Sequence, residues 1–348
     1  MLKITSQIIA LVYLCFFLSC SSSKDTAVKN ESSPKQRYLI LTADDFGASK
    51  NINEGIKYAA DNNGITTISV LSNFSESLPD LHEIAQNHPE IGIGVHLNIV
   101  TGKPLLGVNG VPSLVSDSGD FYTIEKLLPN IKSISLDELR KELRAQIHVL
   151  IDYGIRLDHL SDQNVILSFY GPFFEILTDL ALEFDVPVRS PLLAGVKYPR
   201  VFTNSNMKKR YRHLAFKCVI ASPSAAVALM KNSKVDMMEE KVQKLEELEI
   251  GHPDILVESF WGEPTASNLI HILENLPEGT SEIILHFGTF THPDNIPSGL
   301  ERDYFNHREN ELITVTSDYL KEYYNHLKIK TIGYSDIAAE ENNVGYNF

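Results

Sequence analysis

Short apolar runs alternate with amphipathic segments from Arg37 onward, and this alternation restricts the fold more than any other feature. The runs have the length of buried strands, which we expect over Tyr38–Thr42, Thr66–Leu71, Ile91–Leu97, Arg156–Ser161, Val186–Ser190, Ile255–Ser259, Glu282–His286 and Lys330–Tyr334. Strands that alternate with helices form parallel sheets, because each helix returns the chain to the same end of the sheet. The sequence therefore predicts an α/β fold, most simply a barrel of seven or eight mostly parallel strands.

The clearest helical pattern covers Ser135–Tyr153. Ser135 and Glu138 have the spacing of a capping box at its start. One apolar stripe follows, made of Leu136, Leu139, Leu143, Ile147 and Leu150. Further helices are expected over Val235–Leu248 and Asn310–Leu327.

Two stretches interrupt this rhythm. Lys197–Ala221 contains a basic cluster, Lys208–Arg212, which we interpret as a solvated loop or short surface helix rather than a binding patch. Thr101–Tyr122 is rich in Gly, Pro and Ser and is predicted to be a long loop. In a barrel, long loops after strands commonly build the functional site.

The first twenty residues have the pattern of a leader. An apolar run from Ile8 to Leu18 is too short to span a bilayer comfortably and fits a secretory signal. It ends in Ser19-Cys20, which resembles a bacterial lipobox with Cys20 as the lipidated residue; a plain signal peptide or a short anchor helix is the alternative. We therefore expect a lipoprotein-type signal peptide over residues 1–20, a flexible tether over 21–36 and a single domain over 37–348, anchored to a membrane of the bacterial cell envelope.

Charge and cysteine content exclude several classes of function. The chain has 31 Lys and Arg against 45 Asp and Glu, a net charge of −14, which argues against binding nucleic acid or an anionic membrane surface. Cys15 and Cys20 lie in the leader, so only Cys218 remains in the body, where we expect it to be a buried small apolar residue. This excludes an internal disulfide and a cysteine-rich zinc site.

Ionisable side chains recur where the predicted strands end: Asp44-Asp45, Gly94–Asn98, Asp158–Asn164 and Leu285–Gly288. In a parallel barrel all these ends open on one face, where catalytic groups gather. Of two adjacent carboxylates at a turning strand end, one can bind a divalent cation while the other takes a proton from the bound water. The alternative for Asp44–Gly47 is a capped turn in which Gly47 supplies an unusual φ.

Several motifs resemble the YdjC-like carbohydrate deacetylases, the family that contains chito-oligosaccharide deacetylase. They are TADDFG at 42–47, GITTISVLSN at 64–73, GIGVHLNIVTGKPL at 92–105, VPVRSP at 186–191, PDILVESFWG at 253–262, IILHFGTF at 283–290, RENEL at 308–312 and TIGYSDI at 331–337. The resemblance implies a distorted (β/α) barrel that binds one divalent metal ion and hydrolyses an N-acetyl group of an amino sugar.

The resemblance also implies roles for individual residues. Asp44 matches the family's general base, and Asp45 and His96 match metal ligands. His286 matches a histidine suited to protonating the leaving amine, although FGT here replaces the family's PG. Arg189 aligns with an arginine near the site. Trp261, Phe260, Tyr122 and Phe121 are expected either to stack on sugar or to pack in the core.

The fourth predicted strand departs from the family pattern. Relatives read THLDSHQHVH where this chain reads DHLSDQNVIL, so Gln163 stands in place of the third metal-binding histidine. A glutamine carbonyl is a weaker zinc ligand than imidazole, and Asp162 or His159 are alternatives to it. The ion can be Zn²⁺ or a harder ion such as Mg²⁺ held through oxygens.

The sequence predicts a metal-dependent hydrolase that removes an N-acetyl group from an amino-sugar-containing oligosaccharide or glycan. One alternative is a surface lipoprotein that binds glycan without turnover and has lost the third metal ligand. Another is a hydrolase acting on a different ester or amide of a glycan. The sequence pattern specifies neither the sugar nor the oligomeric state.

Overall fold

The computed structural model describes residues 36–289 and 302–341. The predicted leader, Cys20 and nearly all of the predicted tether lie outside the described residues. From Gln36 onward the chain forms one compact unit. Within the described residues, no single helix is long and apolar enough to cross a membrane, although one pair bent by 96°, Gln163–Phe169 with Gly171–Phe184, passes the same test jointly.

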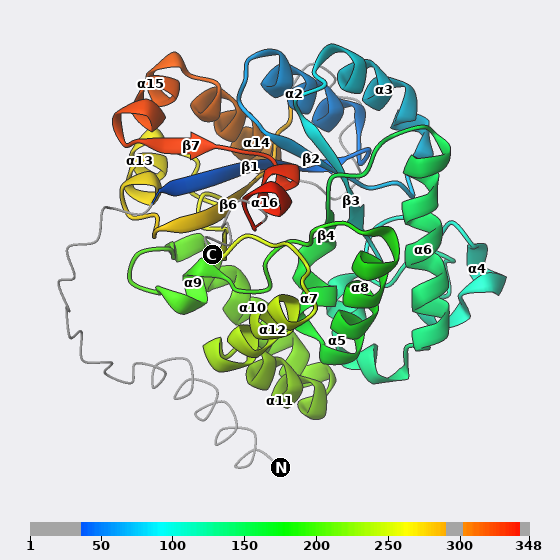
Figure 1. Ribbon diagram of the computed structural model, residues 1–348. Coiled ribbons are helices and arrows are strands. Elements are labelled where there is room, and N and C mark those ends of the chain that lie inside the picture. Colours follow the sequence, from blue (N-terminus) through cyan, green and yellow to red (C-terminus); the bar gives the residue numbers. More distant parts are fainter. Residues whose placement is uncertain (1–35, 290–301, 342–348) are drawn as a thin grey trace, which may run out of the picture. The chain divides into compact units, whose positions relative to one another are not determined.

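Seven parallel strands form a curled sheet at the centre of the unit (Figure 1). They are β1 (Arg37–Phe46), β2 (Thr67–Val70), β3 (Gly92–Leu97), β4 (Leu160–Asp162), β5 (Ile255–Val257), β6 (Gly279–Leu285) and β7 (Ile329–Thr331). The order is β4-β3-β2-β1-β6-β5, and β7 pairs with the first residues of β1. The predicted α/β class and parallel sheet are confirmed.

The strand expected over Val186–Ser190 is wrong. Only single bridges occur there, between Val188 and Leu160 of β4, and between Leu193 and Leu256 of β5. Pro187 and Pro191 lack the N–H groups that a continuous ladder needs. These bridges still join the two edges of the sheet, so the architecture is the expected distorted barrel.

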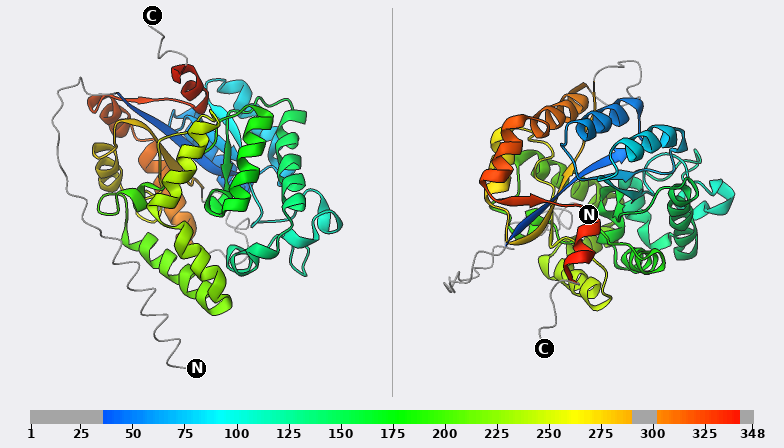
Figure 2. Two further views of the ribbon diagram at one scale, coloured as in Figure 1. Left: turned by 60° about the horizontal axis from the view of Figure 1, so that its bottom comes forward. Right: turned by 45° about the horizontal axis from the view of Figure 1, so that its top comes forward.

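Helices cover the outside of the sheet (Figure 2). On the crossovers between strands lie α2 (Lys50–Asp61), α3 (Leu78–Asn87), α4 (Gly107–Gly110), α5 (Ile124–Asn130), α6 (Leu136–Asp152), α7 (Ile166–Phe169), α8 (Gly171–Phe184), α9 (Ala194–Lys197), α10 (Ser205–Ala221), α11 (Pro223–Asn232), α12 (Val235–Glu247), α13 (Ala266–Glu274), α14 (Arg302–Val315) and α15 (Asp318–His326), and α16 (Tyr334–Glu341) follows the last strand. Short 3₁₀ turns are η1 (Ser75–Ser77), η2 (Pro112–Leu114), η3 (Ile131–Ser133) and η4 (Gln163–Val165).

The predicted helix around Ser135 is confirmed as α6, with the Ser135 side chain accepting from Glu138 N. The other half of the capping box is absent, because the Glu138 carboxylate accepts from Ser113 N instead. The apolar stripe is buried except for Leu136, which is 45% exposed because it is the first residue of the helix.

The prediction of a single helix over Asn310–Leu327 is wrong, because α14 ends at Val315 and a second helix, α15, begins at Asp318. The hydroxyl of Thr316 donates to Leu312 O and that of Ser317 donates to Thr314 O. Such side-chain bonds to nearby backbone compete with helical ones and favour an end at this point.

The basic stretch forms a longer helix than predicted. Helix α10 has 17 residues, and Asn204 caps it by accepting from Met207 N. Helices α10, α11 and α12 lie together on the opposite side of the sheet from α2 and α3 (Figure 1). Cys218 of α10 is buried, as expected. The predicted loop 101–122 contains the short α4 and η2 and one isolated bridge, between Val115 and Phe121. Glu142 of α6 holds the loop by accepting from Leu105 N and Leu106 N.

Candidate catalytic site at the carboxyl ends of the strands

A β-bulge at the end of β1 turns two adjacent carboxylates toward one site. Ala43 pairs with Ile68 and Phe46 with Val70, so three steps along β1 face two steps along β2. Asp45 takes up the extra residue with φ 71°, a left-handed conformation that aspartate tolerates better than most side chains. As a result Asp44 Oδ2 lies 3.8 Å and Asp45 Oδ1 4.0 Å from Nε2 of His96 on β3.

The turn after the bulge depends on Gly47. Its φ is +104°, and a Cβ there would lie 3.0 Å from Leu71 O. Its N–H donates to Asn53 Oδ1. The following helix α2 is capped by Ser49, which accepts from Ile52 N. The two aspartates are therefore not needed as helix caps, and their carboxylates are available to the site.

Asp44 forms a buried ion pair with Arg189. The guanidinium donates from Nη1 to Oδ2 at 2.8 Å and from Nη2 to Oδ1 at 2.7 Å, and also donates to Glu282 Oε1. Glu282 in turn accepts from the hydroxyls of Thr42 and Tyr334. Burial alone would raise the pKa of Asp44, but Arg189 and, more weakly, His96 hold it well below its ordinary value. Asp44 is thus kept charged and fixed in orientation.

Asp45 has its own arginine, which the sequence reasoning assigned to no role. Arg308 of α14 donates to Asp45 Oδ2 and to Phe287 O. Burial opposes ionisation of Asp45, but Arg308 and the nearby histidines lower its pKa. The second carboxylate is therefore also charged.

Gln163 joins His96 to Asp45. Its Oε1 accepts from His96 Nε2 at 2.9 Å, and its Nε2 donates to Asp45 Oδ1 at 3.0 Å. The two residues after it, Asn164 and Val165, both have positive φ and re-aim the chain beyond β4. The structure thus brings Asp44, Asp45, His96 and Gln163 together.

The two alternative third ligands are engaged elsewhere. Asp162 accepts from Leu167 N, Ser168 N and the Ser168 hydroxyl, and so caps α7. His159 is hydrogen-bonded through Nε2 to Ser69 and through Nδ1 to Asp158. Of the candidates on the fourth strand, Gln163 is the one that faces Asp45.

His286 follows β6 beside these carboxylates. Its backbone N–H donates to Glu311 Oε2 at 2.6 Å, while its Nδ1 is buried with no hydrogen-bond partner among the described residues. Burial lowers the pKa of His286 to about 4, although Asp45 acts in the opposite direction. The imidazole is therefore neutral near pH 7 and able to accept a proton.

A cavity of about 490 Å³ adjoins the site. Its lining is drawn from α10, α14 and the segment after β5: Asn206, Lys209, Arg210, His213, Trp261, Gly262, His307, Arg308 and Glu311. Trp261 is half-buried, and the Arg210 guanidinium lies 4.7 Å from its ring centre. Phe260 and Phe121 are core residues, 0% and 4% exposed, so of the aromatic candidates Trp261 is the one on the cavity.

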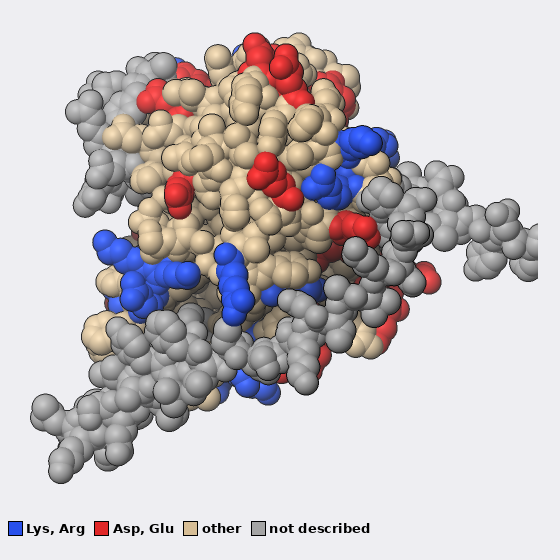
Figure 3. Space-filling view, turned by 90° about the vertical axis from the view of Figure 1, so that its left-hand side faces the viewer, with Lys and Arg blue, Asp and Glu red and all other residues tan. Residues whose placement is uncertain are grey.

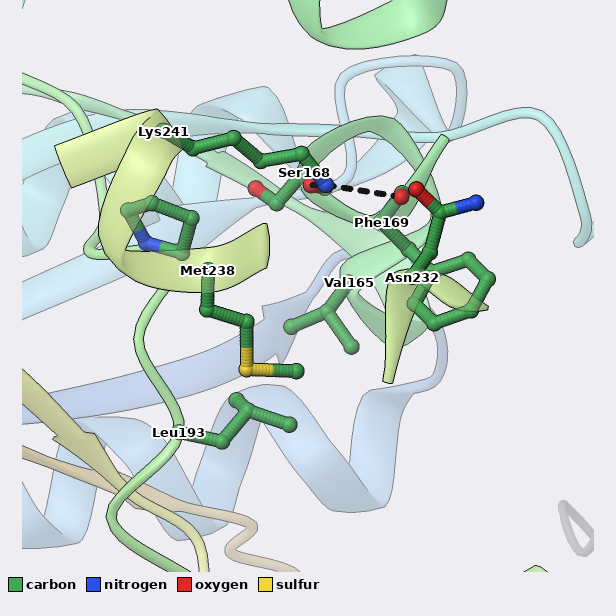
Figure 4. A pocket seen from close by; sticks show the side chains of 8 residues that line it. Val165, Ser168, Phe169, Leu193, Asn232, Met238 and Lys241 are labelled. Atoms are coloured by element: carbon green, nitrogen blue, oxygen red, sulfur yellow. Dashed lines mark hydrogen bonds between the residues drawn. The ribbon is translucent and has the colours of Figure 1, made fainter. Parts of the chain in front are cut away.

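A second cavity, of about 10 Å³, is too small for a sugar (Figure 4). Lys241 lines it and donates to Ser168 O at 2.7 Å and Phe169 O at 2.8 Å. This ammonium caps the carboxyl end of α7 and thereby supports the chain that follows Gln163.

A comparison with known protein families shows to which family the chain belongs. A model of the YdjC-like protein family matches residues 38–326. The chain belongs to the YdjC-like family. A carbohydrate deacetylase of Clostridium beijerinckii is 29% identical over 203 residues, which is 58% of this chain and 78% of that relative. One of Brevibacillus brevis is 33% identical over 162 residues, 47% of this chain and 62% of that relative.

A crystal structure supports the fold assignment. A protein of Enterococcus faecalis V583, described as a cellobiose-phosphate cleavage protein, aligns with a TM-score of 0.66 and 21% identity, covering 86% of this chain and 98% of that one. The predicted resemblance to the YdjC-like family is confirmed, and the names of the curated relatives support the predicted enzyme class, carbohydrate deacetylase.

The YdjC-like resemblance implies a divalent metal, and the donors at the bulge fit an ion bound through oxygen. Within the described residues, no three His, Cys, Asp or Glu side chains converge as metal ligands. Asp45, His96 and Gln163 nevertheless offer a carboxylate, an imidazole and a carbonyl oxygen close together, a set suited to a harder cation than Zn²⁺.

The protonation of His96 is compatible with such an ion. In the tautomer with a hydrogen on Nε2, that hydrogen points to Gln163 Oε1, and a cation bound at Nε2 requires the other tautomer. Nδ1 lies 2.8 Å from Ser161 Oγ, whose own hydrogen goes to Ser69 Oγ. Ser161 Oγ can therefore accept a hydrogen bond from Nδ1. In that tautomer Nε2 carries no hydrogen, and its lone pair is directed at the site.

Proposed function

We propose that this protein removes the N-acetyl group from an amino sugar of an oligosaccharide or glycan. The proposal rests on one observation: the bulge that brings Asp44 and Asp45 within 4.0 Å of His96, beside a cavity of sugar size. The curated relatives named carbohydrate deacetylase support the same reaction.

In the proposed mechanism Asp45, His96 and Gln163 would hold a divalent cation. A cation there would supply Lewis acidity, which lowers the pKa of water and polarises the acetamide carbonyl. Asp44 accepts the proton from the attacking water, and Arg189 keeps that carboxylate charged and correctly turned. Arg308 holds Asp45 in place.

His286 transfers a proton to the nitrogen that leaves as an amine. Because its pKa is about 4, the imidazole begins the cycle neutral, and it must first receive from Asp44 the proton that Asp44 has taken from water. Its Nδ1, which has no hydrogen-bond partner in the described part of the chain, is the atom suited to this transfer. Hydrolysis thereby yields acetate and the free amine with no net proton retained by the side chains.

The hydrogen bonds of Gln163 favour a second candidate function, glycan binding without turnover. Its amide satisfies hydrogen bonds of both His96 and Asp45 without an ion. A protein that binds glycan without turnover would keep this arrangement.

Acetate release separates the two functions. Purified protein is stripped of metal, reloaded with Mg²⁺, Mn²⁺ or Zn²⁺, and offered a panel of N-acetylated sugars, oligosaccharides and O-acetylated glycans. We expect release from an N-acetyl sugar that requires one of the divalent ions. Glycan binding without any release would establish the non-catalytic function, and release from O-acetyl esters alone would establish a glycan esterase.

We also propose that Cys20 carries a lipid that anchors the protein in the bacterial cell envelope. The support is the apolar run that ends in Ser19-Cys20. Labelling cells with a fatty-acid analogue should mark the wild-type protein and leave Cys20→Ala unlabelled. Equal labelling of both, or of neither, would contradict the anchor.

A further inference from the structure

His96 is the first member of a chain of hydrogen bonds that runs from the site into the core. Its Nδ1 lies 2.8 Å from Ser161 Oγ, which donates to Ser69 Oγ at 2.9 Å. Ser69 Oγ lies 2.9 Å from His159 Nε2, and His159 Nδ1 lies 3.2 Å from Asp158 Oδ2. All five side chains are buried, with exposed fractions between 0% and 9%. Two hydroxyls thus join the imidazole of the site to a second imidazole and a carboxylate.

The carboxylate of Asp158 ends this buried chain away from solvent. Charged side chains normally lie at the surface, as those on the face shown in Figure 3 do. Asp158 instead has donors around it in the core: Ser335 N lies 3.1 Å from Oδ1. The Thr67 hydroxyl lies 3.5 Å from Oδ2 and 3.2 Å from His159 Nδ1, so it can donate to the one and accept from the other. Every neighbour of the carboxylate named here can donate to it.

This carboxylate determines the direction of each hydrogen in the chain. An ionised carboxylate only accepts, so the hydrogen between Asp158 and His159 belongs to His159 Nδ1. His159 Nε2 is then an acceptor and takes the single hydrogen of the Ser69 hydroxyl. Ser69 Oγ is left to accept from Ser161, and Ser161 Oγ is left to accept from His96. The chain therefore favours a hydrogen on Nδ1 of His96.

The inner imidazole has little room to turn. A Cβ on Gly94 of β3 would overlap the His159 ring. A Cβ on Gly92 of the same strand would overlap the Asp158 carboxylate. The His159 ring also stacks on the Tyr334 ring, with centroids 4.3 Å apart and planes at 12°. The two glycines and the stacked ring hold the pair in the orientation that the chain requires.

We propose that Asp158 and His159 are positioning residues for His96: acting through the two serines, they keep its hydrogen on Nδ1 and leave Nε2 free to bind the cation. Gln163 Oε1, 2.9 Å from Nε2, favours the other tautomer, so the chain and Gln163 compete for one hydrogen. Both tautomers carry the same charge, so the competition concerns the place of the hydrogen alone. The inference rests on the proposed function for the use of the cation.

Two substitutions alter the chain and leave both imidazoles in place. Asp158→Asn reverses its inner end: Ser335 N holds the amide oxygen at the Oδ1 position, so the amide nitrogen faces His159 Nδ1 as a donor. Ser69→Ala interrupts the chain, because it removes the hydroxyl that donates to His159. In both variants we expect the hydrogen of His96 to move to Nε2.

Each substitution has a matched control. Ser72→Ala removes an equally buried hydroxyl, which donates to Gln146 O and lies outside the chain. Asp61→Asn changes an Asp–His pair at the surface, where Asp61 Oδ1 lies 2.8 Å from His88 Nε2. Neither control should change the tautomer of His96.

Nitrogen-15 NMR of the full chain, labelled at histidine and free of metal, reads the tautomer directly. The chemical shift of a ring nitrogen depends on whether it carries a hydrogen, and the signals missing from His96→Gln assign His96. We expect the hydrogen on Nδ1 in the wild type and both controls, and on Nε2 in Asp158→Asn and Ser69→Ala. Either chain variant is sufficient if the other fails to fold. A hydrogen on Nε2 in the wild type, or the same state of His96 in the wild type and the folded chain variants, would overturn the proposal.

Calorimetric titration with Mn²⁺ or Zn²⁺ measures the consequence for the site. Asp158→Asn and Ser69→Ala should bind the ion about 10–100-fold more weakly than the wild type, and the controls should stay within about twofold. If the wild type binds no ion and releases no acetate, the proposed function fails, while the NMR spectra still decide the place of the hydrogen. Acetate release by the wild type, together with unchanged spectra and ion affinities in both chain variants, would overturn the role of Asp158 and His159 alone.

Discussion

Replacing Arg189 with methionine tests the electrostatic core of the site. The side chain is 2% exposed and donates four hydrogen bonds to Asp44 and Glu282, which are 3% and 0% exposed. Removing the guanidinium leaves two buried carboxylates without their cation. Breaking a buried ion pair from one side costs about 3–5 kcal/mol of unfolding free energy, so we expect a loss of that order at pH 7.

The pH dependence of the loss gives a second, sharper criterion. In the wild type the pKa of Asp44 is lowered, so its contribution is present at neutral pH and is lost as pH falls through and below about 4. Without Arg189, burial dominates and raises the pKa of Asp44, so the variant loses stability as pH rises above about 4. The difference in unfolding free energy between the wild type and Arg189→Met should therefore shrink as pH falls.

Urea denaturation at pH 5, 6, 7 and 8 measures both effects. Arg144→Met is the control, because its partner Glu183 is about as exposed as Arg144 itself, at 38% and 37%, and such a surface pair is worth less than about 1 kcal/mol. A loss for Arg189→Met as small as that of the control, with no change between pH 5 and 8, would refute the reasoning.

Three further predictions concern the third ligand, a buried acid and the core. Gln163→His should tighten binding of Zn²⁺ by about 10–100-fold in calorimetry, since imidazole is the better zinc donor; unchanged affinity would count against Gln163 as a ligand. Burial raises the pKa of Glu258 to about 8, so the protein should lose on the order of 5 kcal/mol of stability as pH rises from about 4.5 to 8, and Glu258→Gln should flatten that slope. Leu143→Ala should cost about 2–5 kcal/mol in urea denaturation, while the exposed Leu136→Ala should cost under about 0.5 kcal/mol.

Local patterns in the sequence predicted the parts of the fold that local physics determines. The stripe through Leu139 and Leu143 matched the period of a helix, and α6 buries both residues. The strand predicted at Val186–Ser190 failed, because apolar content alone did not weigh the missing N–H groups of two prolines. The break before Ser317 was missed because hydroxyl bonds to the backbone leave the apolar pattern unchanged.

The site was predictable only in part. Polar residues at strand ends pointed to Asp44, Asp45, His96 and Gln163, which the structure brings together. Which carboxylate pairs with which cation depends on contacts between residues more than 140 positions apart, and no local pattern encodes them. The sole hint of Arg308 was its place in the RENEL motif, whose spacing puts the Arg308 and Glu311 side chains on one face of a helix.

The basic stretch shows how a composition argument can mislead. Lys208–Arg212 is exposed, as a solvated surface helix would be. Only the packing of α10 beside Trp261 and α14 places Lys209 and Arg210 on a cavity while Lys208 remains outside it. Neighbouring residues of identical type thus differ in position relative to the site.

The most direct test of the central claim is the rate of acetate release by Asp44→Asn, measured on whichever N-acetyl sugar the wild type hydrolyses. Asparagine keeps the shape of the side chain and cannot take a proton from water. The account predicts a fall in kcat/KM of about 10²–10⁴-fold, with calorimetric sugar affinity within about twofold of wild type. Unchanged acetate release by this variant would contradict a reaction centre built on the β1 bulge.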